Sequence, residues 1–110
     1  MKKSLLPLIS AIAQISVVAA FAGPQDTLRI KDHRFIPDTL IAQANERFKL
    51  VVINQDSSAE EFESFPLDRE KVVAPHGEII VFLGPLAQGT YGFIGEFHGL
   101  KGALVIQGGH

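Results

Sequence analysis

Five side chains, in three short segments of the chain, carry carboxylate or imidazole groups of the kind that bind metal ions. They are Glu61 and Glu63, Glu96 and His98, and His33. Carboxylates combined with imidazole form an oxygen-rich site, which suits Cu(II), Fe(III) or Mn(II) better than Cu(I). The chain has no cysteine and its one methionine is Met1, so a metal ion would be bound by oxygen and imidazole.

Alternation along residues 60–64 predicts which of these side chains face the same way. Alternate residues of an extended segment point to one side, so Glu61 and Glu63 share a face. Glu60 and Phe62 face the other way, and Phe62 is expected in the core. Clustered carboxylates raise one another's pKa, and a bound divalent cation relieves their repulsion.

The acidic segment also has a simpler interpretation. Half of the twelve acidic residues lie between Asp56 and Glu70, and runs of charge are usually solvated surface. Arg69 and Lys71 would then serve as counter-charges.

The four histidines have different expected roles. His98 is the strongest ligand candidate, whereas His33 either binds metal or forms hydrogen bonds within its turn. His76 and His110 are expected in an exposed turn and in the C-terminal tail.

The N-terminus predicts export from the cytoplasm. Two lysines precede the uncharged apolar run 5–20, and Ala20-Phe21-Ala22 fits a cleavage site, which together predict a signal peptide over residues 1–22. The apolar run is shorter than the roughly 20 residues of a spanning helix, so we expect no membrane insertion after cleavage. We therefore expect a mature domain over residues 23–110 in the periplasm.

The mature chain is large enough for one domain, and its composition excludes several functions. Without its two leader lysines it has eight basic and twelve acidic residues, a net charge of −4, which argues against nucleic acid as a partner. Lack of cysteine excludes a disulfide scaffold and a thiol enzyme. Its 88 residues leave little room for a sugar cleft between paired carboxylates, and there is no G-x-S-x-G or P-loop motif. The chain is therefore not predicted to be an enzyme, although electron transfer remains open.

Short alternating segments separated by turn residues predict an all-β domain of seven or eight strands. The expected extended segments are 28–30, 39–43, 47–54, 60–65, 71–73, 78–83, 90–94 and 103–106, and the segment 32–37 is expected as a turn-rich crossover. Turn signals every 8–12 residues favour a sandwich or small barrel, and an immunoglobulin-like domain fits this pattern equally well.

Several segments in fixed order resemble the EfeO-type cupredoxin-like domain family. They are Asp32-His33-Arg34-Phe35-Ile36-Pro37, Asn54, Glu60-Glu61-Phe62-Glu63-Ser64, Glu70-Lys71-Val72-Val73 with Pro75, Gly84-Pro85-Leu86 and Gly95-Glu96-Phe97-His98. The resemblance implies a periplasmic Greek-key β-sandwich that binds copper (Cu2+), iron or both. Many such proteins accompany oxidase-dependent iron permeases in bacterial ferrous-iron uptake.

The same resemblance implies where a metal would bind. Residues 89–106 are similar to the copper-ligand loop of cupredoxins, with Gly95 standing about where the thiolate would be, so no thiolate-ligated blue copper site is expected. It further implies that Glu61 and Glu63 approach Glu96 and His98 across the top of the sandwich. The function expected is copper or iron binding in iron uptake, with an iron permease and other periplasmic components as partners. The alternative is a metal-free module that docks a partner protein through its acidic edge.

Overall fold

A computed structural model of the protein describes residues 21–109. The predicted signal peptide lies outside the described residues except for Phe21 and Ala22, and so does His110. Within residues 21–109 the chain forms nine strands: β1 (Gln25–Ile30), β2 (Phe35–Ile36), β3 (Thr39–Gln43), β4 (Phe48–Asn54), β5 (Glu60–Ser64), β6 (Arg69–Val73), β7 (Glu78–Leu83), β8 (Gly89–Gly95) and β9 (Leu100–Gln107). This described part contains no helix long and apolar enough to cross a membrane.

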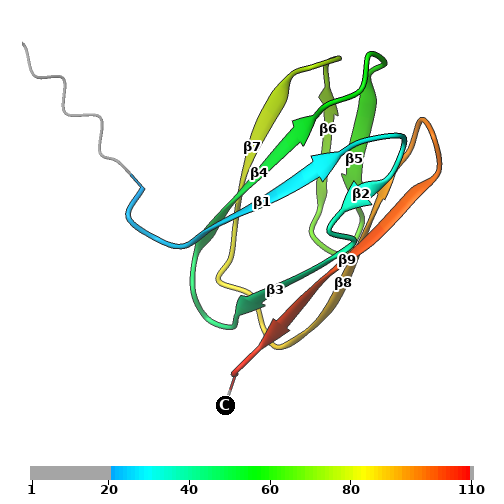
Figure 1. The fold of residues 1–110 in the computed structure, drawn as a ribbon. Helices are drawn as coiled ribbons and strands as arrows, with labels where there is room; N and C mark the ends of the chain where they lie inside the picture. Colours follow the sequence, from blue (N-terminus) through cyan, green and yellow to red (C-terminus); the bar gives the residue numbers. More distant parts are fainter. Residues whose placement is uncertain (1–20, 110) are drawn as a thin grey trace, which may run out of the picture.

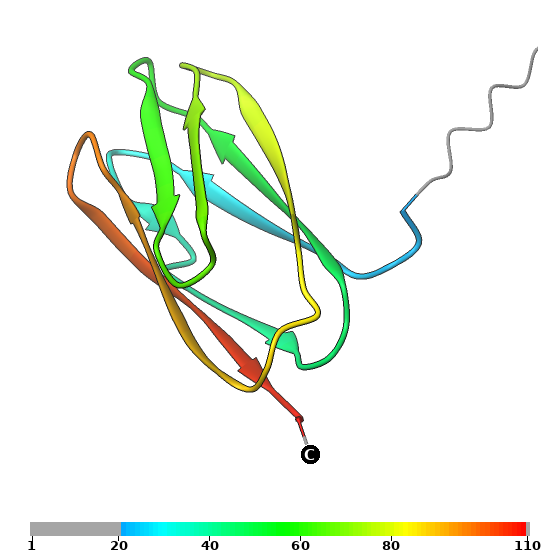
Figure 2. The ribbon, with the colours of Figure 1, turned by 180° about the vertical axis from the view of Figure 1, so that it is seen from behind.

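The strands form two sheets that face each other as a sandwich (Figure 1). One sheet has the order β2-β1-β4-β7 and the other β3-β9-β8-β5-β6. β1 pairs with β4 and β3 with β9 in parallel, whereas the other neighbours are antiparallel. Seen from behind, β5 and β6 lie side by side at one edge of their sheet (Figure 2). The predicted all-β sandwich is confirmed.

The core lies between the sheets and is built from alternate residues of the strands. Phe62 is fully buried, as predicted, and its ring lies 5.3 Å from that of Phe93 and 6.4 Å from that of Phe35. Along β5 the inward side chains are Glu60, Phe62 and Ser64, and all three are buried, whereas Glu61 and Glu63 are half-buried on the outer face. The period-two alternation predicted for this segment is confirmed.

One strand was missed by the sequence analysis, because it is only two residues long. Phe35–Ile36, expected within a crossover, pairs with the end of β1 through a tight hairpin. The hairpin closes because Lys31 and Arg34 exchange main-chain hydrogen bonds of 3.0 and 3.1 Å. The hairpin carries His33, one of the predicted ligands, at its tip.

Candidate functional site

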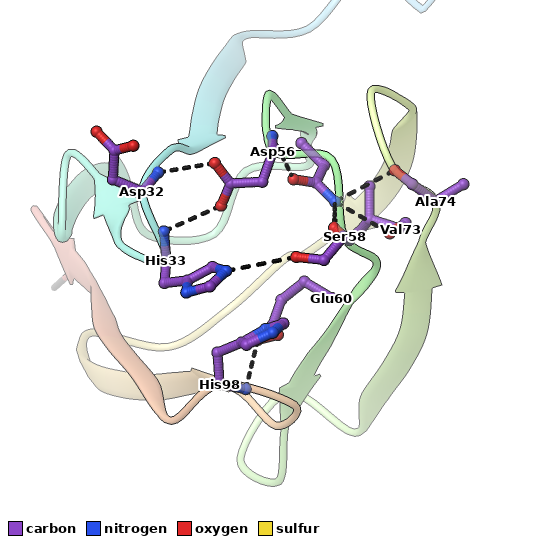
Figure 3. A network of polar contacts seen from close by, with 9 residues as sticks. Asp32, His33, Asp56, Ser58, Glu60, Val73, Ala74 and His98 are labelled. Atoms are coloured by element: carbon purple, nitrogen blue, oxygen red, sulfur yellow. Dashed lines mark hydrogen bonds and ion pairs between the residues drawn. The ribbon is translucent and has the colours of Figure 1, made fainter.

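Three connections meet at one end of the sandwich and bring two of the candidate residues, His33 and His98, together (Figure 3). The β1–β2 turn carries His33, the β4–β5 connection carries Asp56 and Ser58, and the β8–β9 turn carries His98. Glu60 is the first residue of β5, and its side chain lies between Ser58 and His98 (Figure 3). The register of β5 against β8, in which Phe62 is opposite Gly95, places Glu60 beneath the β8–β9 turn.

Glu60 and His98 form a carboxylate–imidazole pair at this end of the sandwich. Oε2 of Glu60 lies 2.8 Å from Nδ1 of His98, and the main-chain N–H of His98 donates to Oε1 over 3.2 Å. Glu60 is only 1% exposed and the His98 side chain 28% exposed. A carboxylate is rarely buried unless it is paired, so this contact accounts for an acidic residue in the interior.

Gly95 makes room for the Glu60 carboxylate. A side chain at position 95 would place its Cβ against Oε1 of Glu60, and 2.8 Å from Cβ of Leu100. Neither approach is possible for a real Cβ, so the carboxylate occupies space that only glycine leaves open. The sequence resemblance puts a thiolate at about this position, and here the neighbouring space contains a carboxylate.

His33 covers His98 from the other side. The two imidazole rings stack with centroids 4.0 Å apart and an angle of 13° between their planes. Nε2 of His33 also lies 3.4 Å from Oγ of Ser58. Asp56 accepts hydrogen bonds from the main-chain N–H groups of Asp32 and His33, and chiefly the bond from His33 lowers the pKa of the Asp56 carboxyl.

A second acidic group lies on the outer face of β5. Glu61, Glu63 and Glu70 can place one carboxylate oxygen each within 4.8 Å of one another, and no other such group of three or more ligands occurs among residues 21–109. Glu63 is paired directly with Glu70 across β5 and β6. Partial burial first, and then neighbouring carboxylates led by Glu70, raise the pKa values of Glu61 and Glu63. Glu96 joins this face, and its main-chain N–H donates to the carbonyl of Glu61 over 2.9 Å.

The structure therefore divides the five predicted ligands into two groups. His98 and His33 lie together at the end of the sandwich, with Glu60 as the carboxylate that His98 contacts. Glu61 and Glu63 face outward, beside Glu70 and near Glu96. The predicted approach of Glu61 and Glu63 to His98 is not seen, because period-two alternation turns Glu60 inward at the point where β5 passes the His98 turn.

Glu60 and Glu70 were not among the predicted ligands. The sequence did hold a signal for Glu60, since it shares its inward direction with Phe62 and an inward acid needs a partner. Glu70 could be found only from the register of β6 on β5. Arg69, proposed as a counter-charge, instead donates to the carbonyls of Leu67, Asp68 and Phe82.

The family of the chain follows from its sequence and agrees with the sandwich. The sequence pattern of the cupredoxin-like domain family matches residues 5–106, nearly the whole chain. The chain belongs to the cupredoxin-like domain family. The cupredoxin type of the predicted Greek-key sandwich is thereby confirmed, and the immunoglobulin-like alternative is set aside.

Relatives and solved structures agree with membership of the cupredoxin-like family. An uncharacterized protein of Rickettsia prowazekii (strain Madrid E) is 42% identical over 71 residues, which are 64% of this chain and 57% of that protein. The match thus spans little more than half of the relative's length.

Two solved structures show the same fold at low sequence identity. The metal binding domain of the Streptococcus pneumoniae Cu(I) exporting P-type ATPase CopA, determined with Cu(I), has a TM-score of 0.69 and 11% identity, covering 82% of this chain and 92% of that one. Auracyanin A, a "blue" copper protein from Chloroflexus aurantiacus, has a TM-score of 0.64 and 15% identity, covering 77% and 100%.

The donor atoms of this cupredoxin-like chain fit a cation bound by nitrogen and oxygen. Nδ1 of His98 and Oε2 of Glu60 already face each other, and the space beside Gly95 is filled by the carboxylate. The chain has no thiol, so copper held here would lack the sulfur ligand of a blue site. The stacked rings of His33 and His98 are nearly parallel, and lone pairs that lie in parallel planes do not converge on one ion.

Proposed function

We propose that this cupredoxin-like protein is exported to the periplasm and binds copper or iron there. The observation that carries the proposal is the contact between the buried Glu60 carboxylate and Nδ1 of His98. A carboxylate and a partly exposed imidazole that face each other can exchange their shared proton for a cation. The EfeO-type resemblance supports a role as an accessory of ferrous-iron uptake, with an oxidase-dependent iron permease as partner.

The two groups on β5 would have different roles in this function. Glu60 and His98 would hold Cu(II) or iron, and copper held there would supply a one-electron acceptor. Glu61 and Glu63, together with Glu96 and the additional carboxylate of Glu70, offer only oxygen, which suits Fe(III) or Mn(II). The pKa values of Glu61 and Glu63 are raised first by partial burial and then by the neighbouring carboxylates, whose repulsion a bound cation would relieve.

Titration of tag-free protein with Cu(II), Fe(II) and Mn(II), followed by EPR and metal analysis, tests the proposal. Cu(II)-loaded protein should be pale and show an ordinary tetragonal signal from nitrogen and oxygen ligands. Glu60→Gln and His98→Ala should each weaken Cu(II) binding at least tenfold, about 1.4 kcal/mol. Glu46→Gln, in the turn between β3 and β4, is the matched control and should bind like the wild type.

Variants on the outer face separate the two groups. If Glu61 is a ligand, Glu61→Gln should weaken binding of Fe(III) or Mn(II) about tenfold and leave the Cu(II) signal of the His98 site unchanged. Cu(II) affinity at the His98 site should fall at acid pH, because the imidazole must lose its proton to bind metal. An intense blue band, or tight Cu(II) binding unchanged at pH 4, would contradict the proposed ligands.

A metal-free docking module is the second candidate function, favoured by one observation. Phe65 follows β5 directly and is 80% exposed, next to the acidic outer face. An exposed aromatic ring beside acidic groups offers a partner protein apolar contact together with charge that is complementary to a basic segment. Protein purified without metal, together with Glu60→Gln and His98→Ala variants that bind metal like the wild type, would favour this function instead.

A further inference from the structure

The hairpin turn that carries His33 has an unusual backbone. Asp32 and His33 both have positive φ angles, of 54° and 57°. Such angles are uncommon for residues other than glycine, and two in succession form the type of two-residue turn that usually contains glycine or asparagine. A histidine in this conformation needs support from its surroundings to keep its position.

Asp56 supplies that support from a different part of the chain (Figure 3). Its Oδ1 accepts from the N–H of Asp32 over 2.8 Å, and its Oδ2 from the N–H of His33 over 2.9 Å. One carboxylate thus binds both main-chain donors of the turn. Hydrogen bonds to an ionised acceptor are about twice as strong as neutral ones.

Asp56 is itself anchored at the end of β4. Its main-chain N–H donates to Oδ1 of Asn54 over 3.0 Å. The buried amide of Asn54 donates in turn to the carbonyl of Ser58 at 2.8 Å, and lies 3.3 and 3.2 Å from those of Val73 and Ala74. Asp56 therefore connects the His33 turn to a rigid part of the sandwich.

The ring of His33 transmits this support to His98. Its stacking over His98, at 4.0 Å and 13°, restricts rotation of a ring that is otherwise held by Glu60 on one side and is 28% exposed. The lone pair of an imidazole nitrogen lies in the plane of its ring. Because the two ring planes are nearly parallel, the nitrogens of His33 and His98 are not directed at one common ion. What His33 offers to the site is its flat surface.

We propose that Asp56 and His33 are positioning residues: Asp56 fixes the turn that carries His33, and the ring of His33 holds the His98 imidazole with Nδ1 toward Glu60. This inference rests on the proposed function, in which His98 binds metal. It gives His33 a role other than metal ligation, through ring stacking on His98, which differs from the hydrogen bonding within the turn that was its alternative interpretation from the sequence. Partners that orient a ligand typically change metal affinity 10–100-fold when they are removed.

The first experiment uses metal-free protein and measures the imidazole resonances of His98 by NMR. The stacked His33 ring should shift the His98 ring protons upfield. His33→Leu should abolish this shift, His33→Phe should retain it, and Asp56→Ala should reduce it. Asp56→Asn, which keeps only one acceptor oxygen, serves if the alanine variant does not fold. Glu46→Ala is the control and should change nothing, whereas His98 resonances unaffected by His33→Leu would overturn the inference.

The second experiment measures Cu(II) affinity and the nitrogen couplings in pulsed EPR for the same variants. His33→Phe should bind Cu(II) like the wild type with unchanged couplings, whereas His33→Leu and Asp56→Ala should bind at least tenfold more weakly. Loss of one nitrogen coupling in His33→Phe would mean that His33 is a ligand, and would overturn the positioning role. If the wild type binds none of the metals, the proposed function fails, and the metal-free NMR result alone decides whether Asp56 and His33 position the His98 ring.

Discussion

Glu60 and Glu61 are neighbours in the sequence, yet they lie on opposite faces of β5 and have opposite surroundings. The Glu60 carboxylate is buried and bound by both the ring and the main chain of His98. The Glu61 carboxylate lies on the outer face among other carboxylates, and its pKa is raised first by partial burial and then by these neighbours. Among residues 21–109, the contact between Glu60 and His98 is the one between an acidic and a basic side chain, whereas Glu61 has no such partner. The carboxylate on the inner face thus takes part in a structural contact, whereas the carboxylates on the outer face repel one another.

The two faces of β5 should differ most in what a substitution costs the free energy of unfolding, and the largest cost is expected for Phe62. This residue lies between Glu61 and Glu63 in the sequence but points inward. Phe62→Ala should lower the free energy of unfolding by about 3–5 kcal/mol, because it leaves a cavity between Phe35 and Phe93. Glu61→Ala, one residue earlier, should change it by less than about 0.5 kcal/mol. Urea denaturation of both variants checks this, and similar losses would contradict the assignment of the two faces.

Glu60→Ala should cause the next largest loss of stability. It removes the acceptor of the His98 main chain and ring and should cost about 2–3 kcal/mol in metal-free protein. The cost should be well above that of Glu61→Ala, measured in the same way. Equal, small effects would show that the Glu60–His98 contact adds nothing to the fold.

Gly95→Ala probes the space that the carboxylate fills. The added Cβ would overlap Oε1 of Glu60 and approach Cβ of Leu100, so the variant should lose about 1–2 kcal/mol. In the Glu60→Ala background the loss should be smaller, since one of the two clashes is gone. A double-mutant cycle measures this coupling. Simple additivity would mean that the two positions do not share the space.

The smallest expected effect is the pH dependence of the outer face. In the folded protein the pKa of Glu63 is raised above the ordinary value of 4.5. At pH values between 4.5 and this raised pKa, the folded protein therefore binds more protons than the unfolded chain. Ionisation of Glu63 therefore lowers stability as the pH rises through this window. Glu63→Gln should be slightly more stable than the wild type at pH 7 and no more stable well below pH 4.5. Thermal unfolding at both pH values measures the difference, and a destabilised variant at pH 7 would point to a favourable partner for Glu63.

Much of the fold follows from local patterns in the sequence. Alternation of apolar and polar residues gives β3 and β7 with the observed bounds, and it turns Phe62 inward and Glu61 outward. These features depend only on the two-residue period of an extended chain. The two-residue strand β2 is too short to show such a period, and it depends on a turn that is held by Asp56.

The sequence by itself determined which ligand atoms the protein has: carboxylates and imidazoles, with no thiol and with His98 in a turn between two strands. Only the tertiary structure decided which carboxylate meets His98. That contact joins residues 38 positions apart and depends on the register of β5 against β8 and on the space above Gly95. A local pattern cannot contain this information, because shifting the register by one residue would bring Glu61 inward in place of Glu60.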